Sequence, residues 1–294
     1  MVDSFINYLE YEKRASKHTV LAYQKDLTQF EEFVAKSFSI TELSEVGHAE
    51  IRAWLIDLVE QKLTPTSVNR KIATLRSFFK YLLRSGVISK DPTYKLKTLK
   101  VPKRLPEFIQ EETIGHIINE IQYTDDFNGQ RDRMVMEFLY LTGVRLSEML
   151  ALNWRDLELV DATVKVLGKR KKERVIPLTP YLVDHIKVYK SHFIDTFGLA
   201  EPTDNFIVTD KKAPAYPMMI YRIVNHYVSR FAQTQKRSPH LLRHTFATHL
   251  LNKGADLNAV KDLLGHANLA ATQVYTHNSM EKLKAVYEQA HPKA

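Results

Sequence analysis

The stretch SPHLLRHTFATHLLNKGADLNAVKDLLGH, residues 238–266, decides how the second half of the chain is expected to fold. Ser238 and Pro239 are typical of a helix N-cap and of the first helical position. Apolar residues follow at helical spacing, and Gly254 and Gly265 are typical of helix C-termini. The stretch therefore predicts a helix, a turn and a second helix.

The start of the first helix gathers basic side chains. His240 and Arg243 stand three residues apart near the positive end of the helix dipole, where an anion is favoured, and both can donate to one phosphate. A zinc site is the alternative, because His240 and His244 have the spacing of a zinc-binding helix. In that motif, however, Leu241 would have to be the glutamate that acts as general base. The residue types favour an anion, although a single member such as His266 could interact with a helix C-terminus instead.

The composition is that of a globular protein without covalent cross-links. The chain has 294 residues, of which 44% are hydrophobic and 26% charged, and it has no cysteine. That length suits two domains of ordinary size. The lack of cysteine excludes disulfides, thiolate metal sites and a thiol nucleophile, and no apolar run approaches the roughly 20 residues that span a bilayer. We therefore expect a cytoplasmic protein with no membrane segment.

A basic segment that contains three prolines divides the chain. The formal net charge is +8, and residues 89–104 hold six Lys or Arg against one acidic residue. Because proline interrupts helices, the sequence predicts an N-terminal domain over 1–88, a linker over 89–106 and a C-terminal domain over 107–294. The linker is either a solvated tether or a strap along a polyanion. In the second case its contacts would come from Lys97, Lys100, Lys103 and Arg104.

The N-terminal domain is predicted to be a small helical bundle. Apolar residues recur at helical spacing over 66–85, and a second helix over 16–34 is expected to turn Leu21, Leu27, Phe30 and Val34 inward. The outer side of the 66–85 helix carries a row of basic side chains. This row is either an ordinary solvated surface or is spaced to meet phosphates. It consists of Arg70, Arg76, Lys80 and Arg84.

The first part of the C-terminal domain predicts two helices in succession. Residues 132–152 indicate a helix, a break at Gly143 and a second helix that carries Arg145 and Glu148. Residues three apart lie side by side on a helix. On this segment alone the two side chains are best interpreted as an ion pair that ties the helix down.

The next part predicts a small antiparallel sheet. Two β-rich runs, 163–167 and 173–178, are joined by a basic turn and indicate a hairpin. Residues 205–210 are expected to add a third strand, and residues 216–232 return to helix. The tip of the hairpin carries Lys169, Arg170, Lys171 and Lys172.

Four motifs in this domain resemble those of the tyrosine recombinase (integrase) family, in particular its bacterial Xer-type members. They are TGVRLSEML (142–150), LGKRKKERVIPL (167–178), HLLRHTFATHLLNKGADLNAVKDLLGH (240–266) and VYTH (274–277). The resemblance extends from YLEYEKRASKHTVLAYQKDL to the terminal HPKA, so it covers nearly the whole chain. It implies a mainly α, two-domain fold, with an N-terminal SAM-like core-binding bundle and a C-terminal α+β catalytic domain. The catalytic set it implies is Arg145, Lys169, His240, Arg243, His266 and Tyr275.

Each implied role is chemically reasonable for these side chains. Arg145 and Arg243 would stabilise charge on the phosphate oxygens, and His240 and His266 would donate hydrogen bonds or transfer protons. Tyr275 would attack phosphorus to form a 3′-phosphotyrosyl link, while Lys169 protonates the departing 5′-oxygen. Such a reaction needs no cofactor and no metal, and the sequence has no P-loop.

The resemblance implies a site-specific DNA recombinase of the bacterial nucleoid. Its partners would be double-stranded DNA and three further protomers, as a homo-tetramer or as a hetero-tetramer with a paralogous recombinase, exchanging strands through a Holliday junction. Its task would be chromosome-dimer resolution or the integration and excision of mobile elements. One alternative is a type IB topoisomerase, and another is a non-enzymatic regulator that uses residues 238–266 as a helix-turn-helix.

Overall fold

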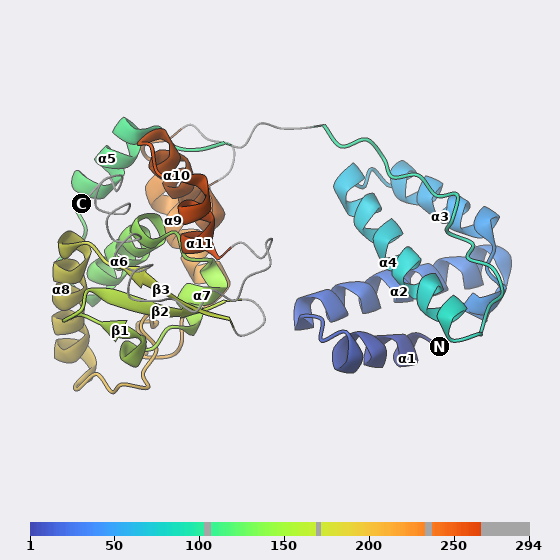
Figure 1. Ribbon diagram of the computed structural model, residues 1–294, viewed down its shortest axis with the longest axis horizontal. Helices are drawn as coiled ribbons and strands as arrows, with labels where there is room; N and C mark the ends of the chain where they lie inside the picture. Colours follow the sequence, from blue (N-terminus) through green and yellow to red (C-terminus); the bar gives the residue numbers. More distant parts are fainter. Residues whose placement is uncertain (103–106, 169–171, 233–236, 266–294) are drawn as a thin grey trace. The chain divides into compact units, whose positions relative to one another are not determined.

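The computed structural model describes residues 1–102, 107–168, 172–232 and 237–265 (Figure 1). The chain divides into two compact units, Met1–Arg104 and Leu105–Ala294, and each has its own hydrophobic core. Both units are mainly helical, and the second adds a small antiparallel sheet, which confirms the predicted fold class. None of the described helices is long and apolar enough to span a lipid bilayer.

The N-terminal unit is a helical bundle with well-capped helices. The Ser16 hydroxyl accepts the Thr19 N–H at the start of α2, and Thr64 caps α4 in the same way. Large aromatic side chains such as Phe30 and Trp54 fill the space between the helices. The elements are α1 (Val2–Asn7), the π-helical turn η1 (Tyr8–Glu12), α2 (Lys17–Phe38), the 3₁₀ turn η2 (Leu43–Glu45), α3 (His48–Glu60) and α4 (Pro65–Arg84).

The prediction that Leu21 of α2 faces the core is wrong. Leu21 is 61% exposed, whereas its neighbour Val20 is buried together with Leu27, Phe30 and Val34. The positions 20, 27, 30 and 34 are spaced by seven, three and four residues, so they form one stripe on a helix with 3.6 residues per turn. Leu21 lies about 100° away from that stripe and faces solvent.

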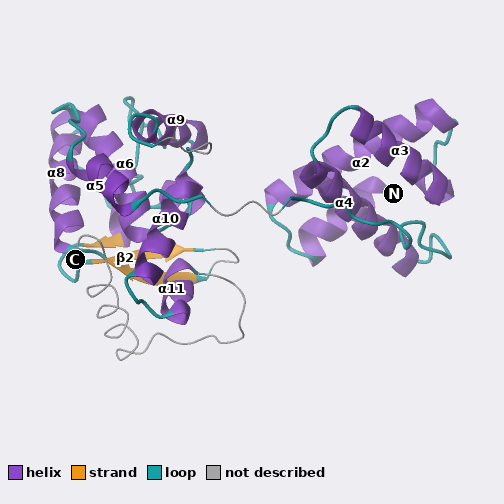
Figure 2. Cartoon of the chain, turned by 90° about the horizontal axis from the view of Figure 1, so that it is seen from above, coloured by secondary structure: helices purple, strands orange, loops and turns teal. Residues whose placement is uncertain are grey.

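The C-terminal unit is built around the buried helix α6, which contacts α8, α9 and α10. Figure 1 shows α8 on one side of α6 and α9, α10 and α11 on the other, and Figure 2 shows the same order from above. The helices are α5 (Glu111–Asn119), α6 (Phe127–Thr142), α7 (Leu146–Ala151), the 3₁₀ turn η3 (Trp154–Asp156), α8 (Pro180–Phe197), α9 (Pro217–Val228), α10 (Pro239–Asn252) and α11 (Leu257–Leu264).

The sheet has three antiparallel strands in the order β1-β2-β3, with β1 at Leu157–Glu158, β2 at Thr163–Leu167 and β3 at Glu173–Pro177. The hairpin of β2 and β3 is therefore confirmed. The predicted third strand over 205–210 is wrong, because the short β1 pairs with β2 instead. The 205–210 segment bonds to a loop, where the Phe206 N–H donates to the Leu152 carbonyl at 2.8 Å, and it never joins the ladder.

Gly143 brings the end of α6 against α10. It ends α6 with φ at 61°, in the left-handed region where glycine is favoured. A Cβ built at this position would lie only 2.4 Å from the Phe246 ring on α10. Only a residue without a side chain fits this approach, and the approach carries Arg145, two residues later, towards α10.

Candidate active site

Three arginines surround the buried carboxylate of Glu148. This residue is 4% exposed and lies in the first turn of α7, where its Oε2 also accepts the Arg145 N–H at 2.8 Å. The Arg145 guanidinium donates to Oε1 at 2.7 Å, and Arg174 donates to both oxygens at 3.0 and 2.8 Å. The Arg243 Nη1 lies 4.0 Å from Oε2. We call these four residues the arginine cluster.

The arginine cluster carries more positive than negative charge. Burial alone would raise the pKa of Glu148, but hydrogen bonds from Arg174 and Arg145 lower it below its ordinary value, so the carboxylate is ionised at neutral pH. Burial, together with the charge of Arg145, lowers the pKa of Arg243 to about 10, which still leaves it charged. Because three guanidinium groups share one carboxylate, the cluster attracts an anion such as phosphate.

The same arginines bind three consecutive carbonyl groups at the end of α11. Arg174 donates to the Leu263 carbonyl at 2.9 Å, Arg243 to the Leu264 carbonyl at 2.6 Å, and Arg145 to the Gly265 carbonyl at 3.0 Å. The last carbonyls of a helix have no partner within the helix and form the negative end of its dipole. The arginine cluster therefore fixes the C-terminus of α11.

The N-terminus of α10 places His240 and Arg243 as the sequence predicts. Pro239 is the first helical residue and Ser238 the N-cap, although in the described structure the serine side chain makes no capping hydrogen bond. His240 is exposed, whereas Arg243 is 5% exposed and also donates to the Gly143 carbonyl. His240 can therefore reach a ligand at the surface, next to the buried guanidinium one turn below it.

The other two described histidines of this stretch have different surroundings. His249 is buried, and its Nε2 donates to the Ile109 carbonyl at 2.9 Å while Nδ1 accepts from the Tyr140 hydroxyl at 3.0 Å. Burial lowers the pKa of His249, so the neutral ring ties α10 to α6 and to the start of α5. Burial and then the charge of His240 lower the pKa of His244. No zinc ligand set was found among the described residues.

Three residues of the predicted catalytic set, Lys169, His266 and Tyr275, lie outside the described residues. Their described neighbours in the sequence are Gly168 and Gly265. A Cβ built on Gly265 would lie 3.2 Å from the Arg174 Nη1, and one built on Gly168 would lie 3.6 Å from the same atom. The chain thus passes the arginine cluster immediately before Lys169 and again before His266.

Sequence reasoning missed Arg174. Arg174 and Ile176 are both buried and lie two residues apart, on the same face of β3, and Arg174 is 5% exposed. A charged residue in an inward-facing strand position is unusual unless it is paired. That inward-facing position was the available signal.

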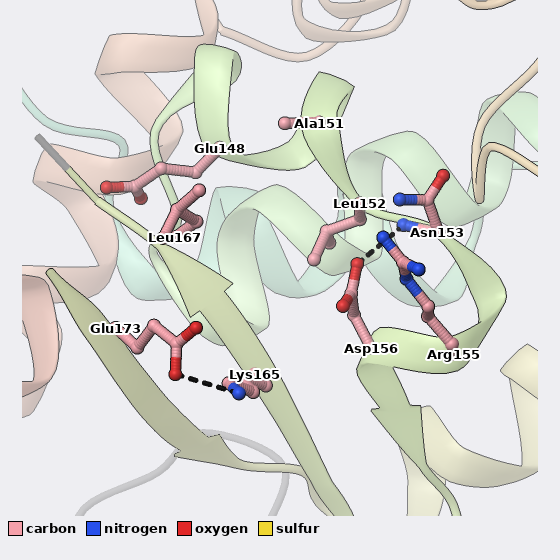
Figure 3. Close-up of a pocket in the computed structure, with 9 residues that line it drawn as sticks. All are labelled: Glu148, Ala151, Leu152, Asn153, Arg155, Asp156, Lys165, Leu167 and Glu173. Carbon is pink, nitrogen blue, oxygen red and sulfur yellow. Dashed lines mark hydrogen bonds and ion pairs between the residues drawn. The ribbon is translucent and has the colours of Figure 1, made fainter. Parts of the chain in front are cut away.

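A separate hollow lies beside the cluster, between α7 and β2 (Figure 3). It has a volume of about 420 Å³. Its acidic side chains are already bonded, since Glu173 pairs with Lys165 at 2.7 Å and Asp156 accepts the Asn153 N–H. Figure 3 shows the Glu148 carboxylate turned away from the Asn153 end, and neither His240 nor Arg243 lines this hollow. It shares Glu148 with the arginine cluster, but none of the three arginines lines it.

The N-terminal unit presents the predicted basic row on the exposed side of α4. Arg70, Arg76, Lys80 and Arg84 are all exposed. Arg70 also binds the buried carboxylate of Asp26 with both terminal nitrogens, and the Arg84 guanidinium lies 4.8 Å from the centre of a tyrosine ring. Arg76 donates to the Leu96 carbonyl. Arg70 and Arg76 thus use part of the guanidinium for bonds within the N-terminal unit, which leaves them fewer donors for a ligand.

The first part of the predicted linker lies against the N-terminal unit. Leu96 is 7% exposed and belongs to the core of this unit. The Asn69 side chain bonds the Leu99 backbone in both directions, at 2.9 and 2.8 Å. The exposed residues Lys97 and Lys100 are therefore carried by this unit next to α4, while Lys103 and Arg104 lie outside the described residues. We call residues 91–100 the strap.

Comparison with known proteins identifies both units. Residues 107–282 match the phage integrase family, and residues 2–86 match the phage integrase N-terminal SAM-like domain. The chain is 35% identical to tyrosine recombinase XerC of Chlorobaculum tepidum, over 99% of this chain and 94% of the relative. It is 36% identical to tyrosine recombinase XerC of Bacillus subtilis, over 100% of this chain and 96% of the relative.

Solved structures share the fold. The integrase of transposon Tn1549 in complex with transposon right end DNA superimposes with a TM-score of 0.71 at 18% identity, covering 96% of this chain and 97% of that one. XerH recombinase bound to its difH substrate gives a TM-score of 0.68 at 20% identity, covering 99% and 82%. The topoisomerase and regulator alternatives are not favoured by these matches. The chain belongs to the phage integrase family and is a tyrosine recombinase of the Xer type.

Proposed function

We propose that this chain cuts and rejoins duplex DNA at a specific site through a covalent link between Tyr275 and a 3′-phosphate. The observation that carries the proposal is the arginine cluster, an excess of buried positive charge beside the N-terminus of α10. The similar structures include a site-specific recombinase bound to its difH substrate and a transposon integrase in complex with transposon end DNA. A DNA phosphodiester is the anion that suits both the cluster and the family.

The cluster would lower the barrier to attack on phosphorus. Negative charge grows on the two non-bridging oxygens as the nucleophile arrives, and fixed donors aimed at them stabilise that state. Arg145 and Arg243 each use two terminal nitrogens inside the protein and keep further N–H donors on the same nitrogens. His240, exposed on the first turn of α10, would add a third donor, and His266 a fourth.

The covalent step conserves the energy of the phosphodiester. The Tyr275 hydroxyl gives its proton to a base, for which His240 and His266 are the candidates, and its oxygen bonds to phosphorus as the bond to the 5′-oxygen breaks. Lys169 gives the departing 5′-oxygen a proton. The free 5′-hydroxyl, or that of another strand, reverses the step and displaces the tyrosine. No nucleotide hydrolysis and no metal ion enters this scheme.

Four protomers would assemble on two DNA sites and exchange strands through a Holliday junction, either as one type of subunit or with a paralogous recombinase. The residues from Ser279 onward would pack on a neighbouring protomer. The N-terminal basic row and the strap would bind the phosphates of each half-site together with Lys103 and Arg104. Such a protein would work at the bacterial nucleoid, in chromosome-dimer resolution or in the movement of mobile elements.

The proposal is tested by finding the site and showing recombination on it. Host genomic DNA fragments that the protein retains are sequenced, and two copies of the enriched sequence are placed on one plasmid. The proposal expects excision of the intervening DNA by the parent chain, alone or with the paralogue, and none by Tyr275→Phe. Relaxation of the plasmid without excision would contradict it in favour of a topoisomerase.

A further inference from the structure

Among the described residues, Arg174 uses all three guanidinium nitrogens within the protein, whereas Arg145 and Arg243 each use the two terminal nitrogens. The side chain of Arg174 is 5% exposed. The side chain of Arg145, in contrast, is 35% exposed. The side chain of Arg243 is also buried, at 6% exposed, so Arg174 is set apart by its three bonded nitrogens, which hold protein groups rather than a ligand.

We propose that Arg174 is a positioning residue for strand cleavage, which holds β3, α7 and the end of α11 in one fixed arrangement. This inference rests on the function proposed above. From β3 its Nε reaches the Leu263 carbonyl of α11, and its two terminal nitrogens hold Glu148 of α7. Glu148 in turn holds the Arg145 guanidinium at 2.7 Å. One side chain thus links three elements that adjoin residues of the proposed catalytic set in the sequence.

The two glycines next to Arg174 make this arrangement close-fitting. Hypothetical Cβ atoms on Gly265 and Gly168 would lie 3.2 and 3.6 Å from its Nη1, and the Gly168 N–H is bonded to the Lys172 carbonyl at 2.7 Å. These glycines directly precede His266 and Lys169 in the sequence. A displaced guanidinium at this point therefore disturbs the chain just before two residues of the proposed catalytic set.

Arg174 also keeps Glu148 ionised. In the described residues, the charged groups that face Glu148 are Arg145 before α7, Arg174 on β3 and Arg243 on α10. Without Arg174, the carboxyl loses the hydrogen bonds that most oppose the effect of burial, so the pKa of Glu148 rises relative to the parent. A protonated Glu148 no longer fixes Arg145 by charge. Cleavage by such a variant should fail progressively as pH is lowered through the raised pKa of Glu148. In the parent, Glu148 stays ionised over the same pH range.

A purely structural role for Arg174 predicts something else. Loss of a buried ion pair would then lower the stability of the unit, but the folded fraction would cleave normally and with the parent pH dependence. Arg131 offers a matched control, since its side chain is 12% exposed and pairs with Asp132 at 2.8 Å. It lies near the start of α6, at the end away from Gly143.

The experiment compares the full-length parent with Arg174→Lys, Arg174→Met and Arg131→Met. The probe is a nicked suicide duplex that carries the mapped site, on which covalent adduct accumulates because the cleaved end is lost. Thermal unfolding, half-site affinity and the first-order rate of adduct formation at saturating protein are measured from pH 8 down to pH 5.5.

We expect Arg174→Lys to bind the half-site within about threefold of the parent and to form adduct about 10- to 100-fold more slowly, as for a misplaced reacting group. Arg174→Met should in addition lose far more of its rate between pH 8 and pH 5.5 than the parent. Arg131→Met should keep the parent rate and pH profile. If Arg174→Met does not fold, the rate of adduct formation by Arg174→Lys at saturating protein decides between a positioning role and a purely structural one.

Two outcomes would overturn the inference in different ways. Folded Arg174 variants that form adduct at the parent rate refute the positioning role alone. A parent that binds the site but forms no adduct refutes the proposed function, and the role of Arg174 falls with it. Binding and adduct formation by the parent are therefore measured first.

Discussion

Replacing Gly143 by alanine tests the approach of α6 to α10 on which the arginine cluster depends. An L-residue at φ of 61° costs about 1–2 kcal/mol. The new Cβ would also lie 2.4 Å from the Phe246 ring and 2.9 Å from the Leu264 side chain, and overpacking of this kind costs about 1–3 kcal/mol. Gly143→Ala should therefore lower the free energy of unfolding of the C-terminal unit by about 2–5 kcal/mol.

Gly254→Ala is the matched control in the same unit. Gly254 has φ of 86° and no neighbouring atom within 4 Å of a built Cβ, so only the backbone cost of about 1–2 kcal/mol applies. In scanning calorimetry of the full chain, Gly143→Ala should unfold roughly 2–12 °C below Gly254→Ala, from about 2–4 °C per kcal/mol for a unit of this size. The adduct-forming rate should fall in Gly143→Ala only. Equal unfolding temperatures and equal rates for the two variants would refute the close approach.

Three further predictions concern DNA binding, the leaving group and assembly. If the basic row and the strap contact phosphates, replacing Lys80 and Lys97 by alanine should flatten the log–log salt dependence of binding by up to about one unit per lost contact, and an unchanged slope would count against these contacts. Lys169→Ala should lose most cleavage of ordinary DNA but regain it when sulfur replaces the bridging 5′-oxygen, because a thiolate leaves without a proton; a lack of rescue would point to Lys171 or Lys172 as the acid. Deletion from Ser279 onward should spare half-site binding and impair recombination, and normal recombination by the truncated chain would exclude a role for this segment in trans.

The sequence was informative wherever a structural feature depends on near neighbours. The α10–α11 pair, the break at Gly143 and the β2–β3 hairpin follow from capping residues, glycine positions and alternation, and all appear in the structure. The Arg145–Glu148 bond, three residues apart, is local as well. The interpretation as a simple ion pair predicted this contact but missed the further partners of Glu148, which are Arg174 and Arg243.

Features that depend on distant segments could not be derived in this way. Arg174 meets Glu148 and Leu263 across separations of 26 and 89 residues, and a local pattern can indicate that a buried arginine is paired but cannot identify partners at such separations. The sequence left the linker open as a solvated tether or a strap along a polyanion. It did not indicate the anchors of this segment, Leu96 and the Asn69–Leu99 bonds, because these depend on α4 packing beside it. Residues 205–210 have strand-like composition, but the loop at Leu152 accepts their backbone hydrogen bond instead of the sheet. Tertiary partners decided each of these cases.

The central claim is that Tyr275 carries the cleaved DNA strand through its 3′-phosphate. The most direct measurement is mass spectrometry of the peptide that remains attached to the suicide duplex after proteolysis of the parent adduct. The account predicts a phosphodiester between the Tyr275 oxygen and the 3′ end of the cleaved strand, a free 5′-hydroxyl on the other fragment, and no adduct with Tyr275→Phe. Attachment at any other residue, a 5′-linked phosphate, or adduct formation by Tyr275→Phe would contradict it.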